Sequence, residues 1–178
     1  EMAQLCDRLG INVWEVVDAA ATKPFGFMPF YPGPGIGGHC ILIDPYYLAW
    51  KAREKDFVTN FIQLAAEINE DMPFYVESMV IKEIAKQEVS LKNAKILILG
   101  MAFKKDVDDL RHSPALKVAE LLEKDNILQI DYYDPYIPSI KLNGKELNSL
   151  KEINPKVLAN YDVCVITTDH SVFDYEMI

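Results

Sequence analysis

The sequence lacks any apolar run near the roughly 20 residues that a membrane-spanning helix needs, and no charged segment leads into an apolar core at its start. We therefore expect no membrane partner and a cytoplasmic protein. Positive charge is also scarce, because 18 Lys and Arg residues face 27 Asp and Glu residues, for a net charge of −9. This balance argues against a nucleic-acid partner.

Cysteine and histidine are too few and too scattered for the common metal sites. Cys6, Cys40 and Cys164 lack C-x-x-C spacing, and the 3 histidines share no i, i+4 spacing, so we expect neither disulfides nor a metal. Cys6 on an apolar helix face and Cys164 in an apolar strand are typical of small buried hydrophobic residues. Cys40 differs, because it follows Gly37 and Gly38 with little to shield it.

Helical spacing of apolar residues predicts two short helices within residues 1–21, separated by Gly10. Residues 22–45 are rich in proline and glycine and predict a long loop, which in a compact domain is commonly functional. A short helix should follow over 46–54. A helix over about 60–88 is longer than one small domain needs, so we expect it to join two domains or two subunits.

From Lys95 the pattern changes to buried strands, at 94–100, 127–134 and 162–169, with helices opening at Ser113-Pro114 and Asn154-Pro155 between them. This alternation predicts an α/β fold with a doubly wound parallel sheet, whose ligands lie at the carboxyl ends of the strands. We expect a helical central domain over 1–92, joined by the long helix to a Rossmann-like domain over 93–178. Residues 100–111, 134 and 168–170 should then share one edge.

Gly33, Gly35 and Gly38 match the G-x-G-x-x-G pattern of dinucleotide-binding loops. That fingerprint needs a buried strand immediately before it, which Pro32 and Pro34 argue against. Three interpretations remain open at this point: a dinucleotide loop, a tight structural turn, and a loop whose backbone approaches a ligand closely.

Cys40 and Asp44 together suggest covalent chemistry, because a thiol in an open, glycine-walled site near a carboxylate is typical of a nucleophile with its base. Lys104, Lys105 and Arg111 flank the loop after the first predicted strand. There they indicate either phosphate contacts or surface solubility.

Two segments together resemble a known family: KPFGFMPFYPGPGIGGHCILIDPYYLAWKARE, residues 23–54, and GMAFKKDVDDLRHSPALKVAELL, residues 100–122. They are similar to the central and C-terminal parts of the UDP-glucose/GDP-mannose dehydrogenase family, and within it more to the UDP-N-acetylglucosamine 6-dehydrogenases than to the UDP-N-acetylmannosamine branch. The resemblance implies that this chain holds a central dimerisation domain and a C-terminally truncated UDP-binding domain, without the N-terminal NAD-binding domain.

The resemblance also implies a reaction, in which the carbon-6 alcohol of a UDP-N-acetylhexosamine is oxidised to a carboxylate by two hydride transfers to NAD, for polysaccharide or glycan biosynthesis. By position, Cys40 matches the nucleophile that forms a thiohemiacetal and then a thioester, and Asp44 matches the aspartate that assists proton transfer. Arg111 matches a contact to the cofactor's phosphates. The implied substrate contacts are Tyr31, Gly33, Gly35, Gly37, Phe103 and Lys104.

The resemblance further implies a homodimer through the central helices, and we expect the 178 residues alone to be inactive. A non-catalytic UDP-sugar binding module is the alternative.

Overall fold

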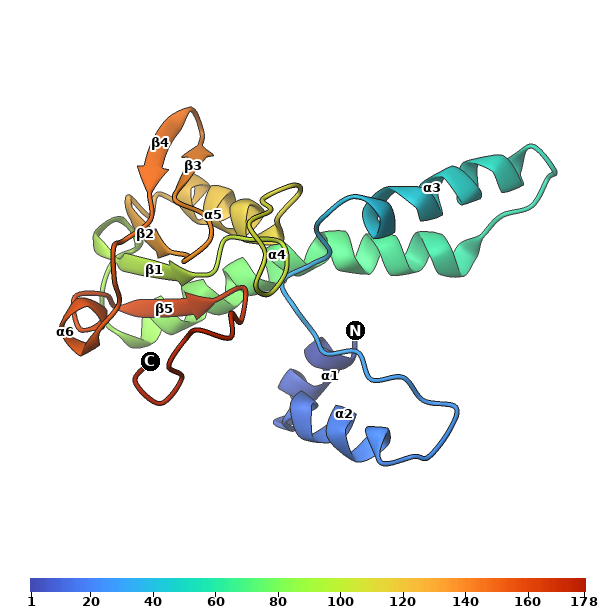
Figure 1. Ribbon diagram of the computed structural model, residues 1–178, viewed down its shortest axis with the longest axis horizontal. Coiled ribbons are helices and arrows are strands. Elements are labelled where there is room, and N and C mark those ends of the chain that lie inside the picture. Colours follow the sequence, from blue (N-terminus) through green and yellow to red (C-terminus); the bar gives the residue numbers. More distant parts are fainter. The chain divides into compact units, whose positions relative to one another are not determined.

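The computed structural model describes residues 1–178, which form two compact units, 1–33 and 34–178 (Figure 1). Residues 34–92 group with the sheet in the second unit. The division into domains at 1–92 and 93–178 therefore stays a prediction. None of the helices combines the length and apolarity needed to cross a membrane.

The first unit contains α1 (Met2–Leu9) and α2 (Val13–Ala21), as predicted. Gly10 ends α1 in the left-handed conformation at φ 67°, where glycine lacks the steric cost of a Cβ. Asn12 caps α2 by accepting a hydrogen bond from the Trp14 N–H at 3.0 Å. Cys6 is buried between the two short helices, as expected from its position on an apolar face.

The second unit begins with an antiparallel helical arm, α3 (Cys40–Arg53) and α4 (Asn60–Lys86). The long helix is confirmed, but α3 starts at Cys40, inside the stretch predicted to be loop. Pro45 lies within α3 and cannot donate to the Ile41 carbonyl, at a cost of one hydrogen bond near the start of the helix. Proline density was therefore the wrong guide to where this loop ends.

The sheet of the second unit is parallel, in the order β2-β1-β5, and confirms the predicted strands. Its strands are β1 (Lys95–Leu99), β2 (Gln129–Tyr133) and β5 (Val163–Ile166). In register, Ile96 faces Ile130 on one side and Val163 on the other. The chain leaves β1 toward β2 and later returns to the opposite edge, which makes the gap between β1 and β5 the topological switch point.

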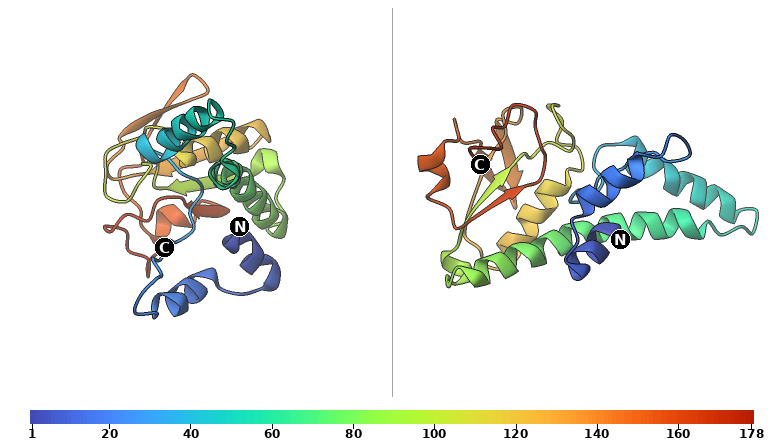
Figure 2. Two further views of the ribbon diagram at one scale, coloured as in Figure 1. Left: turned by 90° about the vertical axis from the view of Figure 1, so that its right-hand side faces the viewer. Right: turned by 90° about the horizontal axis from the view of Figure 1, so that it is seen from below.

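Helices and loops cover both faces of β1, which explains its unbroken apolar sequence. Ile96 and Ile98 pack toward α4 and α5 (Pro114–Lys124), while Leu97 and Leu99 pack with Phe173 on the opposite face. Figure 2 shows α4 passing along one side of the sheet with α5. α6 (Pro155–Leu158) lies between β4 and β5 in the sequence, and a short 3-10 helix (Leu91–Asn93) links α4 to β1.

Two features of this unit depart from the sequence analysis. An unpredicted hairpin, β3 (Ser139–Leu142) and β4 (Lys145–Asn148), turns at Asn143-Gly144, a dipeptide that favours tight hairpin turns. Cys164, expected to be buried, is exposed, because β5 is an edge strand of the three-stranded sheet.

The packing of α4 against the end of α5 contains a carboxyl pair that makes stability depend on pH. A hydrogen bond to Asp125, followed by burial, raises the pKa of Glu77 from 4.5 to about 7. The folded protein therefore binds more protons than the unfolded chain between these two values, so its stability is full below the lower pKa and falls as pH rises through the higher one.

We expect the free energy of unfolding to drop by about 2 kcal/mol from about pH 5 to about pH 8, after allowing for the partial exposure of Glu77. Glu77→Gln, which cannot ionise, should flatten this slope. The measurement is urea unfolding across that range. Glu120→Gln, in the surface pair with Lys117, is the control and should keep the parental slope. An unchanged slope in Glu77→Gln would contradict the assignment.

Candidate functional site

The glycine-rich loop before α3 packs directly on the loop that follows β1. The Gly38 N–H donates to the Arg111 carbonyl at 2.8 Å. A Cβ on Gly37 would lie 2.7 Å from the Phe103 Cβ, and one on Gly38, at φ 85°, would lie 2.8 Å from the Phe103 ring. The missing side chains thus make room for Phe103 and bring two backbones together.

This packing separates the three interpretations of the glycine pattern. A helix does begin just after Gly38, as in a dinucleotide loop, but no strand precedes it. The Gly38 amide is also already bonded within the protein, so it is not free for a phosphate. Gly35 lies at φ 144°, with its Cβ position 3.0 Å from Pro114. Close packing therefore accounts for these glycines, and a substrate contact at Gly35 or Gly37 stays a prediction.

Cys40 is the first residue of α3 and is exposed, with its Sγ 3.8 Å from His39 Nδ1. His39 makes no side-chain cap, so the amides in the first turn of α3 remain available to an incoming group. Asp44 lies one helical turn further and is also exposed, on the same face as Cys40. The helix therefore places a carboxylate near the thiol, an arrangement suited to proton transfer.

The loop after β1 brings the other predicted contacts of this unit to the carboxyl edge of the sheet. Phe103 is half-buried against the glycines, whereas Lys104 is exposed and has no carboxylate partner. Lys105, by contrast, pairs with Asp169 of the loop after β5 at 3.3 Å. Lys104 is thus a cation without a carboxylate partner in the chain, and its contact with substrate stays a prediction.

Arg111 is held by Asp109 through a forked ion pair. Arg111 Nε lies 3.0 Å and Nη2 2.7 Å from Asp109 Oδ2. Hydrogen bonds from the Arg111 side chain and backbone hold the pKa of Asp109 below its ordinary value. The same pair raises the pKa of Arg111, and Cys40 is close enough to contribute a smaller electrostatic effect. Asp109 thus occupies one side of the guanidinium, and Nη1 is left over for another acceptor.

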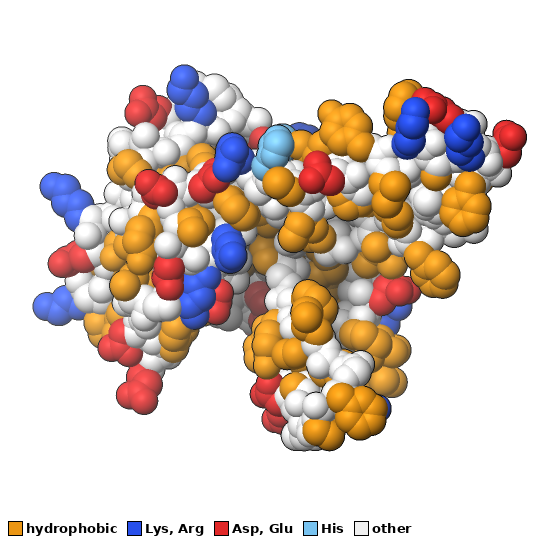
Figure 3. All heavy atoms as spheres, turned by 45° about the vertical axis from the view of Figure 1, so that its right-hand side comes forward, with side chains coloured by type: hydrophobic (Ala, Val, Ile, Leu, Met, Phe, Trp, Pro, Cys, Tyr) orange, Lys and Arg blue, Asp and Glu red, His pale blue; other side chains and the backbone are white.

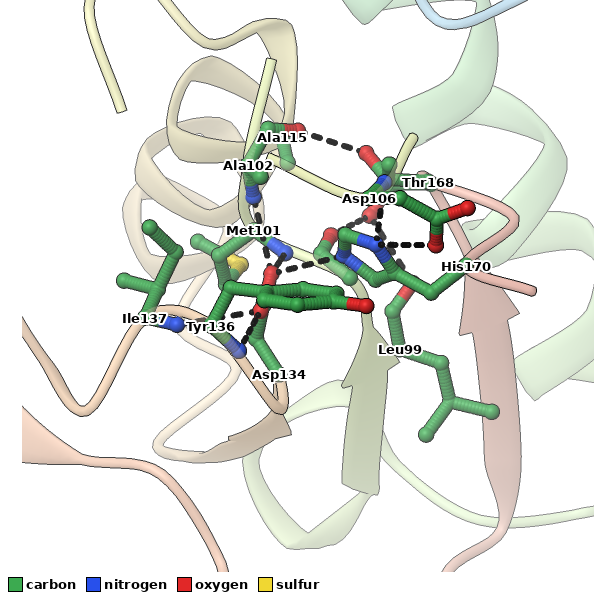
Figure 4. A network of polar contacts seen from close by, with 12 residues as sticks. Leu99, Met101, Ala102, Asp106, Ala115, Asp134, Tyr136, Ile137, Thr168 and His170 are labelled. Carbon is green, nitrogen blue, oxygen red and sulfur yellow. Dashed lines mark hydrogen bonds and ion pairs between the residues drawn. The ribbon is translucent and has the colours of Figure 1, made fainter. Parts of the chain in front are cut away.

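The ends of all three strands meet in a buried polar network, which confirms that residues 100–111, 134 and 168–170 share one edge. Asp134 follows β2, and its Oδ2 accepts hydrogen bonds from the Met101 and Ala102 amides after β1. His170, beyond β5, lies between Asp134 and Asp106 (Figure 4). Sequence reasoning placed these residues at the edge but gave them no role.

Tyr31 and Gly33 belong to the first unit and are described with it. Tyr31 Oη donates to Asp18 Oδ1 at 2.7 Å, and its ring meets Trp14 edge-on at 6.1 Å between centroids. The bond to Asp18 raises the pKa of Tyr31. Tyr31 is thus tethered to α2, and its predicted contact with substrate stays a prediction.

A hollow of about 790 Å³ lies between α3, α4 and the start of α5. Its lining is mostly apolar and includes Ile41, Phe61 and Pro114, but not Cys40, Lys104 or Arg111. An apolar lining without the thiol or the free cation does not suit a nucleotide-sugar, so we place the candidate site at Cys40 and the loop after β1. The structure holds no cluster of three or more side chains able to bind a metal.

Comparison with known families covers both parts of the chain. Residues 1–71 match the central domain of the UDP-glucose/GDP-mannose dehydrogenase family, and residues 97–178 match its UDP binding domain. The chain belongs to this family. The family prediction and the α/β fold with a Rossmann-like domain are therefore confirmed.

Several relatives in this family are named for the N-acetylated sugars that they oxidise. A UDP-N-acetyl-D-mannosamine dehydrogenase of Methanococcus vannielii is 37% identical over 97% of this chain and 37% of its own length. A UDP-N-acetyl-D-glucosamine 6-dehydrogenase of Pseudomonas aeruginosa is 32% identical over 97% of this chain and 40% of its own. These identities do not favour the glucosamine branch over the mannosamine branch.

A solved structure of a UDP-D-ManNAc dehydrogenase from Pyrococcus horikoshii superposes with a TM-score of 0.81 at 31% identity. The superposition covers 98% of this chain and 39% of the Pyrococcus chain. The chain thus spans about two fifths of the dehydrogenases it matches, and the activity of a complete enzyme is a matter for proposal.

Proposed function

We propose that this chain is the central and UDP-binding part of an NAD-dependent dehydrogenase that oxidises a UDP-N-acetylhexosamine at carbon 6 to the carboxylate. The observation that carries the proposal is the position of Cys40. Its exposed thiol begins a helix next to the loop bearing Phe103, Lys104 and Arg111, and a main-chain bond from Gly38 to Arg111 joins the two segments. An exposed thiol thus lies on a segment bonded to a loop whose cations suit a nucleotide diphosphate.

The chemistry assigned to Cys40 is covalent capture of the aldehyde formed by the first oxidation. The sulfur adds to the carbonyl carbon and the oxygen takes a proton, giving a thiohemiacetal that cannot leave before the second oxidation. Loss of a second hydride from carbon 6, together with the proton of the adduct's hydroxyl group, turns this adduct into a thioester. Water then adds to the thioester, and the thiol leaves as the carboxylate forms.

Asp44 would move protons during these steps, since it shares a helix face with Cys40 and is open to solvent. The first-turn amides of α3 are suitable donors to the oxygen of the adduct, where negative charge develops. Lys104 would bind the phosphates of the substrate. Phe103 would form the rest of the substrate site with the predicted contacts of the glycine-rich loop, which are Tyr31, Gly33, Gly35 and Gly37.

NAD, when bound, supplies the hydride acceptor. Among the residues of this chain, Arg111 fits a contact with its phosphates, because the guanidinium is exposed and Asp109 occupies only its Nε and Nη2 side. The oxidised sugar would serve polysaccharide or glycan biosynthesis.

Thiol labelling of the complete protein tests this assignment, and Cys164 serves as the internal control. We expect iodoacetamide to modify Cys40 at least about tenfold faster than Cys164, because partial burial of the Cys164 sulfur raises the pKa of its thiol. UDP-N-acetylglucosamine should protect Cys40 and leave the rate at Cys164 unchanged. Peptide mass spectrometry measures both. An inert Cys40, or one that substrate does not protect, would favour the non-catalytic binding module instead.

We also propose that the protein is a homodimer through its central helices. Large apolar side chains on the α3–α4 arm are exposed, among them Tyr47, Trp50 and Phe61, which is 88% exposed (Figure 3). Apolar surface of this kind is typical of interaction sites. Light scattering should give twice the chain mass, and Phe61→Glu should shift it toward the monomer. A monomeric parent protein would refute the proposal.

A further inference from the structure

The segment that carries Phe103 and Lys104 lies outside the hydrogen-bonded strands, so other groups must hold it in place. Its start is fixed by Asp134, whose Oδ2 accepts from the Met101 N–H at 2.6 Å and the Ala102 N–H at 2.9 Å. Thr168 Oγ1 donates to the Ala102 carbonyl at 2.6 Å. These bonds anchor the segment immediately before Phe103.

Asp134 is almost fully buried, at 3% exposed, and has no Lys or Arg partner. Its second oxygen, Oδ1, accepts from the Tyr136 and Ile137 amides at 2.8 and 3.1 Å. Four backbone amides and one imidazole therefore surround this carboxyl group, which satisfies its hydrogen-bonding capacity in the interior. A buried group bonded in this way holds its neighbours in one arrangement.

His170 connects that carboxyl group to the far end of the same segment. The imidazole is fully buried, with Nδ1 3.0 Å from the Asp106 N and Nε2 3.1 Å from Asp134 Oδ2. A backbone N–H can only donate, so Nδ1 accepts and the ring proton lies on Nε2, which donates to Asp134. The ring also packs against Tyr136 and Phe173, with centroids 4.9 and 5.3 Å away.

Asp106 is held by a second contact from the loop after β5. Its side chain accepts from the Ser171 N–H at 2.8 Å and the Ser171 hydroxyl at 2.6 Å. These bonds lower the pKa of Asp106. Asp106, at φ 58°, is thus fixed through both its backbone and its side chain.

We propose that His170 and Asp134 form a positioning pair that holds both ends of residues 101–106 and so sets the place of Phe103 and Lys104 for the UDP-sugar. The inference rests on the function proposed above. Neither His170 nor Asp134 needs to touch the substrate. Lys104 has no partner of its own in the chain, so the clamped backbone is what directs its side chain.

A double-mutant cycle on UDP binding tests the pair in the complete protein. Lys104→Met should weaken UDP binding about tenfold through loss of a charge-assisted contact. His170→Phe keeps an aromatic ring but removes both hydrogen bonds, and should also weaken binding about tenfold. If His170 acts through Lys104, the double variant should lose little more than either single variant, well short of the hundredfold loss expected of independent effects. Titration calorimetry with UDP measures all four proteins.

His170→Asn supplies the rescue variant, because its Oδ1 can replace Nδ1 as the acceptor for the Asp106 amide. We expect it to recover most of the UDP affinity. If His170→Phe fails to fold, Asp134→Asn takes its place in the cycle, because it keeps the shape of the side chain but loses an acceptor for the Met101 and Ala102 amides. Tyr161→Phe, which loses a hydrogen bond to Asp131, is the control for general loss of stability and should bind UDP normally.

Three results would overturn the positioning pair. They are parental UDP affinity in His170→Phe, additive effects in the cycle, and UDP binding by His170→Asn that is no tighter than UDP binding by His170→Phe. Failure of the proposed function gives a different result. In that case the parent protein would not bind UDP, or Lys104→Met would bind it as well as the parent does.

Discussion

Cys40→Ala should reduce uronic acid formation by the complete enzyme at least about 10³-fold, while the protein stays folded and binds UDP with its parental affinity. The reason is that the aldehyde would no longer be held covalently between the two oxidations. Cys40 is exposed at the start of α3, so replacing it creates no cavity and removes no core contact. The loss should therefore appear in turnover and not in stability.

The measurement is acid production and NAD reduction with UDP-N-acetylglucosamine and UDP-N-acetylmannosamine as alternative substrates. This pair of assays also identifies the sugar, which the relatives leave open between the two epimers. Cys164→Ala, at the other exposed thiol, is the matched control and should turn over normally. Normal turnover in Cys40→Ala would end the case for a cysteine nucleophile.

Gly100→Ala should destabilise the protein by about 3–5 kcal/mol or prevent folding. Gly100 ends β1 at φ 86°, where its N–H donates to the Tyr133 carbonyl at 2.9 Å. A Cβ would lie 2.3 Å from the Thr168 carbonyl oxygen and 2.7 Å from the Thr168 Cβ. Because backbone from β5 blocks the space, the strand ends would have to separate.

Gly144→Ala provides the comparison, since Gly144 has a similar φ of 82° but nothing within 4 Å of the Cβ position. It should cost only about 1–2 kcal/mol, the conformational penalty alone. Urea unfolding of the two variants then separates backbone strain from the steric block. Equal losses of unfolding free energy in the two variants would show that Thr168 can move aside at little cost. The close approach at the strand ends would then not limit the residue at position 100.

Much of the second unit could be predicted because its signals are local. Ser113 followed by Pro114 marked the start of α5, and Ser113 Oγ indeed accepts from the Ala115 amide. The apolar run of β1 also follows directly from burial on a covered sheet. Cys40 and Lys104 are likewise indicated by residue type and by position in the sequence.

What the sequence could not give depends on contacts between distant segments. His170 and Asp134 are separated by 36 residues, and nothing in either neighbourhood shows that the loop after β1 supplies Asp106 as the second partner of the imidazole. The exposure of Cys164 depends on strand order, which an apolar pattern does not specify. The packing of Gly37 could not be predicted for the same reason, because its close neighbour, Phe103, is far away in sequence.

The main-chain bond between Gly38 and Arg111 ties the start of α3 to the loop after β1. Both bonded atoms belong to the backbone, so the bond itself does not depend on the side chains beside it. We therefore expect replacement of the His39 or His112 side chain to leave the backbone at Cys40 in place. The position of the thiol is set by the path of the chain, and its immediate neighbours can change without rebuilding it.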